Sequence, residues 1–571
     1  MSYPFDLLYR IKRPAFYIGN EYNTIRKEKE GKIKVALAFP DTYDIGMSSL
    51  GFSIIYNVIN AREDALAERV FAPWVDMEEY LREKQLPLLT LESGSLVSAF
   101  DILGFSMSYE LNYSNVINIL DLSGIPIFSF EREKLPLVVA GGGCTTHPSP
   151  LLPFIDCFVV GDGEEVINEM IDIFKEWRVN SNRKEELLKT LSDIDGIYVP
   201  LFHKTVKRRI VKDLNKTPYP TRPLVPNTEV IHDRAIVEIM RGCTRGCRFC
   251  EAGFIYRPVR ERSLEKVISL SDDILSSTGY NEIGFLSLSV SDYSQIEGLT
   301  RYIEEGLIPL YISVSTPSLR VDTSSIEFFH AIGEIKRGLT FAPEAGTQRL
   351  RDIINKNVTE EDIFNVIKIT SKEGWRSVKL YFMIGLPTEG EEDIIEIPRL
   401  INEIRKIDKK IEINVSISIF VPKPHTPFQW TGQISPTEAK EKISILSKNL
   451  NRKGISISWH DPYVSVLEGI LTRGGKELSN VILNAWKNGA RFDAWTDQYK
   501  WEIWEKALKE EGIDWMIYLK EKNYQDPLPW DFVDVRVKKE FLWKEYQIGL
   551  SGVRREDCRI KGCYNCGVCP Y

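Results

Sequence analysis

The sequence predicts an α/β protein with three structural parts: a doubly wound Rossmann-like domain, a partial (β/α)6 barrel and a helical C-terminal domain that ends in a cysteine-rich metal site. Apolar strand-like runs alternate with helical stretches in two successive series, which is typical of parallel sheets covered by helices. Seven of the nine cysteines fall into two tight groups. Seven of the twelve tryptophans lie between Trp486 and Trp543, which we interpret as a helical domain packed by large rings.

The first series predicts a Rossmann-like domain over residues 33–200, after an N-terminal extension over 1–32. Its four strands are expected within 32–41, 100–109, 135–143 and 155–161. Ligands of such sheets bind at the carboxyl ends of the strands. The segments "PDTYDIG", "SMSYE" and "GGGCTTH" occupy those ends.

The second series predicts the barrel over residues 229–435, after a basic and proline-rich linker over 201–228. We expect the linker to form a hairpin and then an extended stretch. The helical domain is expected over 436–550 and the cysteine-rich tail over 551–571. The six barrel strands are predicted within 234–243, 282–293, 309–322, 336–346, 377–387 and 414–428.

The bulk composition favours a globular intracellular protein. Hydrophobic residues make up 43% of the 571 residues and charged residues 27%. No membrane span or export signal is recognisable, so we expect a cytoplasmic location. The net charge of −8 argues against a surface built generally for duplex nucleic acid, although it leaves room for a local basic groove.

The segment "RGCTRGCRFCEAG" carries three cysteines, Cys243, Cys247 and Cys250, directly after the first predicted barrel strand. A 4Fe-4S cluster normally takes four thiolates, so three leave one iron open to an external ligand. Zinc would require a fourth protein ligand, and His232 is expected at the other end of the strand. The spacing therefore predicts a catalytic 4Fe-4S cluster.

The pattern C-x3-C-x-aromatic-C, with Phe249 before the last cysteine, resembles the signature of the radical S-adenosylmethionine (SAM) enzymes. The resemblance implies that the amino and carboxylate groups of SAM chelate the open iron. It also implies that one electron from the reduced cluster releases a 5′-deoxyadenosyl radical.

Other barrel segments extend the resemblance to SAM contacts. Glu344 matches the fourth-strand position that meets the ribose, and Gly385 and Pro387 match the fifth-strand turn near the adenine. The second strand departs from the Gly-Gly-Glu-like segment of many relatives. There, the resemblance leaves Ser289, Ser291 or Asp292 to contact the methionyl amine.

The N-terminal domain resembles that of cobalamin-binding radical SAM proteins, and the likeness covers about residues 33–430. Asp41 and Gly46 fit the pattern Asp-x-His-x-x-Gly, but Tyr43 replaces the histidine that ligates cobalt, and a phenol is a poor ligand. The resemblance implies cobalamin bound without that histidine; the alternative is a domain that holds no corrinoid. The residues expected along the corrinoid tail are Ser106, Gly141, Gly142 and Gly143.

Three further side chains lie close to that turn or in its sheet. Cys144 and His147 follow the glycine turn and could approach such a ligand. Cys157 is expected to pack as a small hydrophobic residue.

The tail carries Cys558, Cys563, Cys566 and Cys569 with C-x4-C-x2-C-x2-C spacing, which is a complete metal site. Zinc sites usually pair two C-x2-C units across a longer loop. Successive x2 spacings followed by proline are closer to ferredoxin loops, so we favour a second 4Fe-4S cluster over zinc.

We therefore expect a radical SAM iron–sulfur enzyme associated with cobalamin that modifies RNA, a peptide or a small molecule and receives electrons from flavodoxin or ferredoxin. No catalytic side chain is assigned. One alternative is a methylthiotransferase-like RNA or protein modifier, although the N-terminal domain has only Cys144 and Cys157 where those enzymes hold a cluster on three cysteines. Another is a non-enzymatic, metal-containing RNA-binding or assembly protein.

Overall fold

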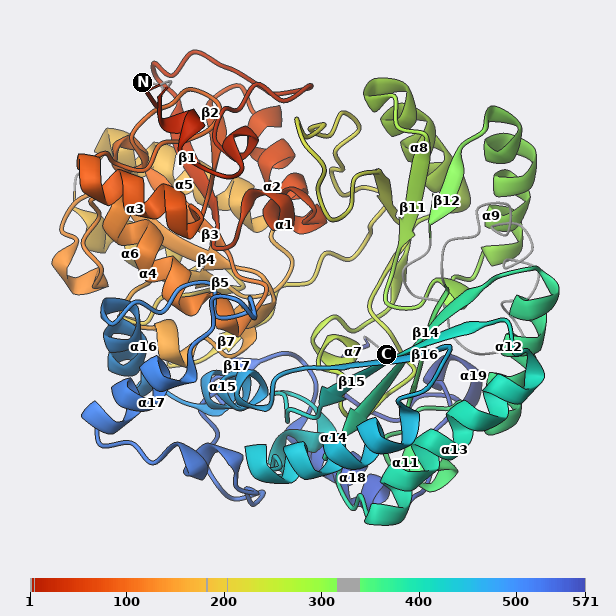
Figure 1. Ribbon diagram of the computed structural model, residues 1–571. Coiled ribbons are helices and arrows are strands. Elements are labelled where there is room, and N and C mark those ends of the chain that lie inside the picture. Colours follow the sequence, from red (N-terminus) through yellow and green to blue (C-terminus); the bar gives the residue numbers. More distant parts are fainter. Residues whose placement is uncertain (1–2, 5, 181–182, 203, 316–338, 570–571) are drawn as a thin grey trace.

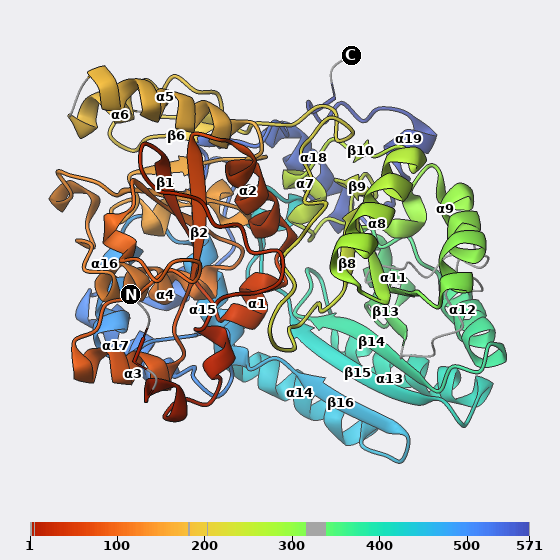
Figure 2. The ribbon, with the colours of Figure 1, turned by 90° about the horizontal axis from the view of Figure 1, so that it is seen from above.

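The computed structural model (Figure 1) describes residues 3–4, 6–180, 183–202, 204–315 and 339–569. Two bodies of parallel strands make up most of the molecule, which confirms the predicted α/β class. The N-terminal sheet lies on one side, and the second series of strands lies on the other side in both views (Figures 1 and 2). Among the described residues, no helix is both long and apolar enough to span a bilayer.

The N-terminal sheet has the strand order β2-β1-β3-β4-β5-β6, and only β6 is antiparallel to its neighbour. Alternate residues point to opposite faces of a strand. Val35 and Leu37 of β1 join one apolar core with α2 and α5, whereas Ala36 and Ala38 join a different core with α3 and α4. Helices thus cover both faces, as a doubly wound sheet requires. The element bounds are β1 Ile33–Phe39, α1 Tyr43–Met47, α2 Leu50–Ala61, β2 Ala65–Phe71, α3 Val75–Lys84, β3 Ile102–Ser106, α4 Tyr113–Leu122, β4 Leu137–Gly141, β5 Cys157–Val159, α5 Val166–Asn180, α6 Lys184–Leu191 and β6 Ile197–Tyr198.

The edge strand β2 was not predicted because Glu68 and Arg69 interrupt its apolar run. Both charged side chains are nevertheless buried. The Arg69 guanidinium lies 2.8 Å from the Glu21 carboxylate and 2.6 Å from that of Glu92. Paired charges thus replace the apolar residues that usually mark a buried strand.

The second series of strands forms two parallel sheets, β8-β11-β12 and β13-β14-β15-β16. Strands β8, β11, β12, β13 and β14 lie within the first five predicted segments, and β15 overlaps the sixth but begins two residues earlier, at Glu412. Residues 316–338 of the predicted third and fourth segments lie outside the described residues. The seventh, β16, follows α14 and pairs with β15, although only helices were expected after residue 435. The bounds are β8 Ala235–Glu238, β9 Met240–Arg241, α7 Ala252–Ile255, β10 Arg260–Glu261, α8 Leu264–Thr278, β11 Glu282–Leu286, α9 Ile296–Tyr302, β12 Ser313–Ser315, β13 Leu339–Glu344, α11 Gln348–Ile353, α12 Glu360–Lys372, β14 Ser377–Ile384, α13 Glu391–Ile407, β15 Glu412–Ile419, α14 Pro436–Leu450 and β16 Ile455–Trp459.

The C-terminal helix α16 packs on α4, which covers one face of the N-terminal sheet. Asn118 of α4 accepts a hydrogen bond of 3.1 Å from the Trp486 indole. The predicted linker hairpin is wrong, because β7 (Val206–Lys207) pairs in parallel with the distant β17 (Val533–Asp534). The remaining helices are α15 Pro462–Arg473, α16 Leu478–Lys487, α17 Trp501–Glu510, α18 Lys539–Leu550 and α19 Cys558–Lys561.

Candidate active site between the two sheets

The loop with Cys243, Cys247 and Cys250 follows β8 and the short β9, at the carboxyl end of the first barrel strand. Gly242, with φ of +93°, begins the loop, and a Cβ there would lie 2.6 Å from the carbonyl oxygen of Pro258. Burial raises the pKa of the Cys250 thiol to about 12, and the Cys247 and Cys243 sulfurs beside it raise the pKa further. The three sulfurs therefore lie near one another.

The side chain of Asn355 holds the middle of this loop. Its amide nitrogen donates to the carbonyl oxygens of Arg245 at 3.0 Å and Gly246 at 3.1 Å. The buried Arg248 guanidinium donates to the Ile353 carbonyl at 2.8 Å. The loop is thus fixed to the segment after α11 without using any cysteine.

The spacing of the ligand sulfurs differs between a single metal ion and a cluster. Among the described residues, no three cysteines of either group have sulfur atoms that all lie within 4.8 Å of one another. Tetrahedral zinc with Zn–S bonds of about 2.3 Å brings its sulfur ligands to roughly 3.8 Å from one another. A cluster spreads its thiolates wider because each binds a different iron. The choice of a second cluster over zinc at the tail cysteines stays a prediction.

The end of β11 presents the two serines of the predicted SAM site. Ser289 and Ser291 are 2% and 9% exposed, and neither hydroxyl has a hydrogen-bond partner in the structure. A buried hydroxyl without a partner costs about 1–3 kcal/mol, so these two suit a ligand that would complete them. Asp292 instead contacts Arg245 of the cysteine loop, with Arg245 Nε 2.8 Å from the carboxylate.

The other predicted SAM residues lie at the ends of β13 and β14 or in the cysteine loop. Glu344 has φ of +69°, which is unusual for a side chain other than glycine, and its carboxylate lies 3.0 Å from Lys356. Lys356 also lies near enough to Cys250 to lower its pKa. Gly385, with φ of +80°, and Pro387 form the turn after β14, and Phe249 is half-buried. These SAM contacts stay predictions.

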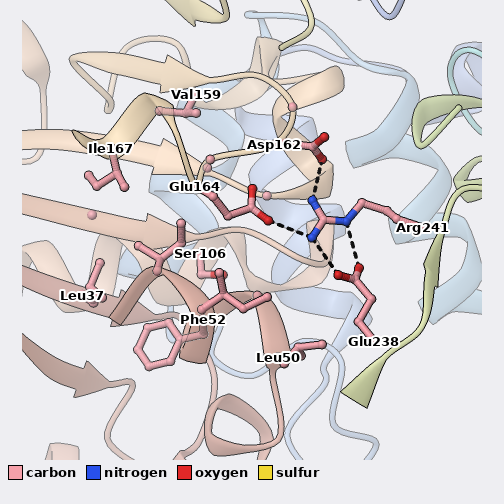
Figure 3. A pocket seen from close by; sticks show the side chains of 18 of the residues that line it. Leu37, Leu50, Phe52, Ser106, Val159, Asp162, Glu164, Ile167, Glu238 and Arg241 are labelled. Carbon is pink, nitrogen blue, oxygen red and sulfur yellow. Dashed lines mark hydrogen bonds and ion pairs between the residues drawn. The ribbon is translucent and has the colours of Figure 1, made fainter. Parts of the chain in front are cut away.

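A cavity of about 420 Å³ separates the N-terminal sheet from the barrel (Figure 3). Leu37, Ile102 and Val139 from the sheet and Ile54 and Ile167 from α2 and α5 give it an apolar interior. Among the described residues, none of the lining side chains is a histidine, cysteine or lysine.

Only part of the predicted cobalamin set reaches this cavity. Ser106, Gly141 and Gly142 line it, whereas Gly143 lies beside it with its Cβ position 3.4 Å from the Tyr256 hydroxyl. Of the loop after β1, neither Asp41, Tyr43 nor Gly46 is part of the described lining.

The side chains of the loop after β1 instead make contacts away from the cavity. The Tyr43 ring is 1% exposed and stacks 5.2 Å from Phe16, centroid to centroid. The Asp41 carboxylate accepts a hydrogen bond of 2.9 Å from the Trp495 indole. A Cβ on Gly46 would lie 2.3 Å from the Phe71 ring. The Tyr43 ring therefore packs in the core and does not line the cavity.

An arginine that sequence reasoning missed dominates the barrel side of this cavity (Figure 3). Arg241 of β9 lies 3.0 Å from Asp162, 2.7 Å from Glu164 and 2.8 Å from Glu238. Burial opposes its charge, but the three carboxylates outweigh burial and raise the pKa of Arg241 above its usual value. Asp162 and Glu164 belong to the N-terminal domain, so this ion cluster joins the two bodies. The "GDGEE" segment after β5 and the arginine two residues before Cys243 were the available signals.

A second buried network joins the glycine turn to the cysteine loop. His147 lies 2.9 Å from Glu110 and 3.3 Å from Glu251, the residue after Cys250. The Lys423 ammonium lies 2.9 Å from the same Glu110 oxygen. Glu110, Cys144 and His147 are close enough to hold a metal ion, but Lys423 and His147 already balance the carboxylate charge. Cys144 and His147 are thus buried in this network, and Cys157 packs in the sheet core as predicted.

The tail folds against the cysteine loop. Cys558, Cys563, Cys566 and Cys569 line a second cavity of about 400 Å³, together with Thr244, Arg245 and Gly246 of that loop. The Thr244 hydroxyl donates to Asp557 at 2.8 Å. The tail cysteines thus lie beside the three-cysteine loop, about three hundred residues away in sequence.

The fold and these two cysteine sites define an α/β iron–sulfur protein, and comparisons with known proteins identify its family. Residues 51–200 match the model "Radical SAM proteins, N-terminal" and 237–401 match "Radical SAM superfamily". A protein of Methanocaldococcus jannaschii described as uncharacterised is 30% identical over 453 residues, which cover 78% of this chain and 90% of that protein. The chain therefore belongs to the radical SAM superfamily, whose members are enzymes that use a 4Fe-4S cluster and SAM.

Two further proteins are similar over smaller parts or at lower identity. The tRNA-2-methylthio-N(6)-dimethylallyladenosine synthase of Chromohalobacter salexigens is 28% identical over 243 residues, which cover 39% of this chain and 51% of that enzyme. The chain thus matches only about half the length of that relative. The structure of the radical SAM methyltransferase TsrM from Kitasatospora setae superposes with a TM-score of 0.48 at 14% identity, over 70% of this chain and 74% of that one.

Proposed function

We propose that Cys243, Cys247 and Cys250 hold the 4Fe-4S cluster and that the strand ends around them bind SAM for reductive cleavage. When bound, the reduced cluster and SAM supply a 5′-deoxyadenosyl radical. The observation that carries the proposal is the pair of partnerless buried hydroxyls, Ser289 and Ser291, in the segment that follows β11. Their oxygens can accept hydrogen bonds from the methionyl ammonium of SAM.

The remaining contacts orient the two ends of SAM. The Glu344 carboxylate can accept from ribose hydroxyls, and Lys356 fixes its direction from 3.0 Å away. The backbone N–H of Gly385 donates to Glu389 at 2.8 Å, which fixes the turn after β14 where the adenine would lie. Arg245, through its contact with Asp292, keeps the end of β11 against the cysteine loop.

Electron paramagnetic resonance of the reduced, reconstituted protein tests SAM binding directly. SAM should change the cluster signal of the wild type, because a ligand then occupies the open iron. The Ser289→Ala/Ser291→Ala variant should need a higher SAM concentration for the same change. A signal that SAM leaves unaltered in the wild type would overturn the proposal.

The 420 Å³ cavity is proposed as the site of the corrinoid tail. The fit rests on two glycines of the lining, Gly104 and Gly141, whose missing side chains leave room for a ligand. A Cβ added at either would meet only one neighbouring atom, at 3.4 and 3.8 Å. The apolar interior suits an aromatic base, and Ser106 of the lining offers a hydroxyl. When bound, cobalamin would supply methyl transfer. Because Tyr43 is in the core and the described lining offers no histidine, no imidazole of this chain is expected on the cobalt.

A graded substitution at Gly104 tests this site. Gly104→Ala adds one methyl at ordinary contact distance and should bind hydroxocobalamin much as the wild type does. Gly104→Leu fills the cavity and should weaken binding at least tenfold, with a similar unfolding temperature for both variants. Equal binding by the leucine variant would remove the corrinoid from this cavity.

The substrate is proposed to be RNA, a peptide or a small molecule, modified by methylation if cobalamin takes part and by hydrogen abstraction if it does not. A methylthiotransferase-like reaction is the second candidate, because a curated relative carries out that chemistry on tRNA. Against a second cluster in the N-terminal domain, Cys144 and Cys157 are the only cysteines between residues 33 and 200, and both side chains are buried in the core.

A further inference from the structure

Four arginines line the cavity of about 400 Å³ beside the tail cysteines, and one of them, Arg257, has no acidic partner among the described residues. The residue is nevertheless buried, with 7% of its surface exposed. Each of the other three arginines contacts a carboxylate. These pairs are Arg245 with Asp292 at 2.8 Å, Arg555 with Glu545 at 3.0 Å and Arg559 with Glu261 at 3.3 Å. Arg257 is therefore the arginine of this lining whose charge the described chain does not balance.

The Arg257 guanidinium also leaves most of its hydrogen-bond donors unused. Its Nε donates to the Gly253 carbonyl at 2.8 Å, and its central carbon lies 4.5 Å from the centroid of the Phe254 ring. Neither terminal nitrogen has an acceptor in the part of the chain that the structure describes. An arginine stays charged in proteins, and a buried charge is costly unless it is paired and hydrogen-bonded. The free donors therefore indicate a negatively charged group beside Arg257.

The tail cysteines lie within electrostatic reach of this guanidinium. Burial raises the pKa of the Cys558 thiol, and the positive charge of Arg257 opposes that rise. At Cys569, burial and the neighbouring cysteines raise the pKa, and Arg257 again opposes the rise. A Cβ on Gly246 would lie 3.7 Å from Nη2 of Arg257. The guanidinium thus lies against the three-cysteine loop and near the tail cysteines.

Metal binding would give these cysteines the charge that Arg257 lacks. The thiolate, not the thiol, is the form of cysteine that binds a metal. Four thiolates carry four negative charges, and a zinc ion or an oxidised 4Fe-4S core returns two of them. The loaded site therefore keeps a net charge of about −2. A metal-free tail with protonated thiols offers Arg257 no such charge.

We propose that Arg257 is the counter-charge of a metal–thiolate site on Cys558, Cys563, Cys566 and Cys569, so that the guanidinium and the bound metal stabilise each other. Arg257 is a positioning residue and not a ligand, because a guanidinium has no lone pair to give to a metal. Zinc and a 4Fe-4S cluster share the chemistry that Arg257 recognises, which is thiolate sulfur with net negative charge. The proposal concerns the tail site alone and does not depend on SAM cleavage.

The rate of metal release tests the proposal. Anaerobically purified protein is analysed for zinc and iron, which shows which metal the tail holds, and is then mixed with an excess of a chelator for that metal. The tail phase of the release is the phase that Cys563→Ala/Cys566→Ala lacks. Arg257→Gln removes the charge but keeps an amide donor, and it should release the tail metal at least about tenfold faster than the wild type.

Two further variants show whether the charge and its burial cause the effect. Arg257→Lys keeps the charge and should release the tail metal more slowly than Arg257→Gln does. Lys561→Gln is the matched control, because it removes one positive charge from the same segment at a side chain that is 61% exposed. Exposed charges are screened by water, so this control should release the metal like the wild type. Equal release by Arg257→Lys and Arg257→Gln, or by Lys561→Gln and Arg257→Gln, would overturn the proposal.

Hydrogen exchange of the metal-free protein separates a counter-charge from a packing role. Without metal, the Arg257 charge is unbalanced, so Arg257→Gln should leave amide exchange over residues 551–569 unchanged or make it slower. Faster exchange in metal-free Arg257→Gln would show that Arg257 serves to pack the tail, which would contradict the proposal. A wild-type tail that holds neither zinc nor iron would contradict it as well.

Discussion

The Arg241 ion cluster allows a quantitative test of how the two bodies are joined. Replacing Arg241 with glutamine removes the only ionic partner that Glu164 has in the described structure, and the Glu164 side chain is 5% exposed. Asp162 still contacts Arg260, and Glu238 keeps Arg262 at 3.5 Å. Leaving one partner of a buried pair unpaired costs about 3–5 kcal/mol. We expect Arg241→Gln to lower the free energy of unfolding by that amount.

A double-mutant cycle isolates the pair. Glu164→Gln alone should cost about 1–2 kcal/mol, because Arg241 retains two carboxylates and the glutamine can still accept a hydrogen bond. The double variant should be more stable than Arg241→Gln, since no unpaired charge remains at residue 164. The coupling energy should then exceed about 1 kcal/mol.

Urea unfolding provides the assay, with the fluorescence of Trp495 and its neighbours and the far-ultraviolet circular dichroism followed together. If the two probes separate, the first transition is the one to compare, because a multidomain chain need not unfold in one step. Strictly additive effects of the two substitutions would refute the assignment of Glu164 as dependent on Arg241.

Three further predictions follow from buried polar groups and from the tail. Ser289→Ala should leave the ligand-free protein as stable or more stable, since a partnerless hydroxyl is removed, yet raise the SAM dissociation constant about tenfold; lower stability with unchanged affinity would contradict this. Cys563→Ala/Cys566→Ala should remove about half of the iron, with the SAM-responsive signal retained, whereas one zinc per wild-type chain would show that the tail metal is wrong. Burial lowers the pKa of His425 from 6.5 to about 4, so its contribution to stability is complete above pH 6.5 and is lost as the pH falls toward 4, by up to roughly 3 kcal/mol. His425→Asn, which tolerates the φ of +56° at this position, should flatten that acid limb in thermal unfolding at several pH values.

The sequence predicted those strands whose burial is achieved by apolar side chains. Four strands of the N-terminal sheet come from nearly continuous apolar runs, and barrel strands such as β14 and β15 bury apolar side chains at alternate positions. Sequence patterns failed to predict strands whose burial depends on partners elsewhere in the chain. The charged residues of β2 are buried through the Arg69 ion pairs, and β16 ("ISISW") is an edge strand with three of its five residues exposed.

The site residues that belong to a local sequence motif were predictable. Those that meet only through tertiary packing were not. The cysteine loop and the serines after β11 lie in short segments whose spacing carries the information. Arg241, Asp162 and Glu164 meet only after the two bodies pack together, so no local pattern marks them. Tyr43 occupies the motif position of a ligand, but its ring is held by Phe16 from the N-terminal extension, a contact that spacing alone does not reveal.

The formation of 5′-deoxyadenosine tests the central claim most directly. The wild type and the alanine variants of Cys243, Cys247 and Cys250 are reconstituted anaerobically, reduced with dithionite and incubated with SAM, and the product is measured by mass spectrometry. The wild type should form 5′-deoxyadenosine, or transfer the SAM methyl group in the presence of cobalamin, and each variant should form neither product. Undiminished product from the triple alanine variant would contradict the account.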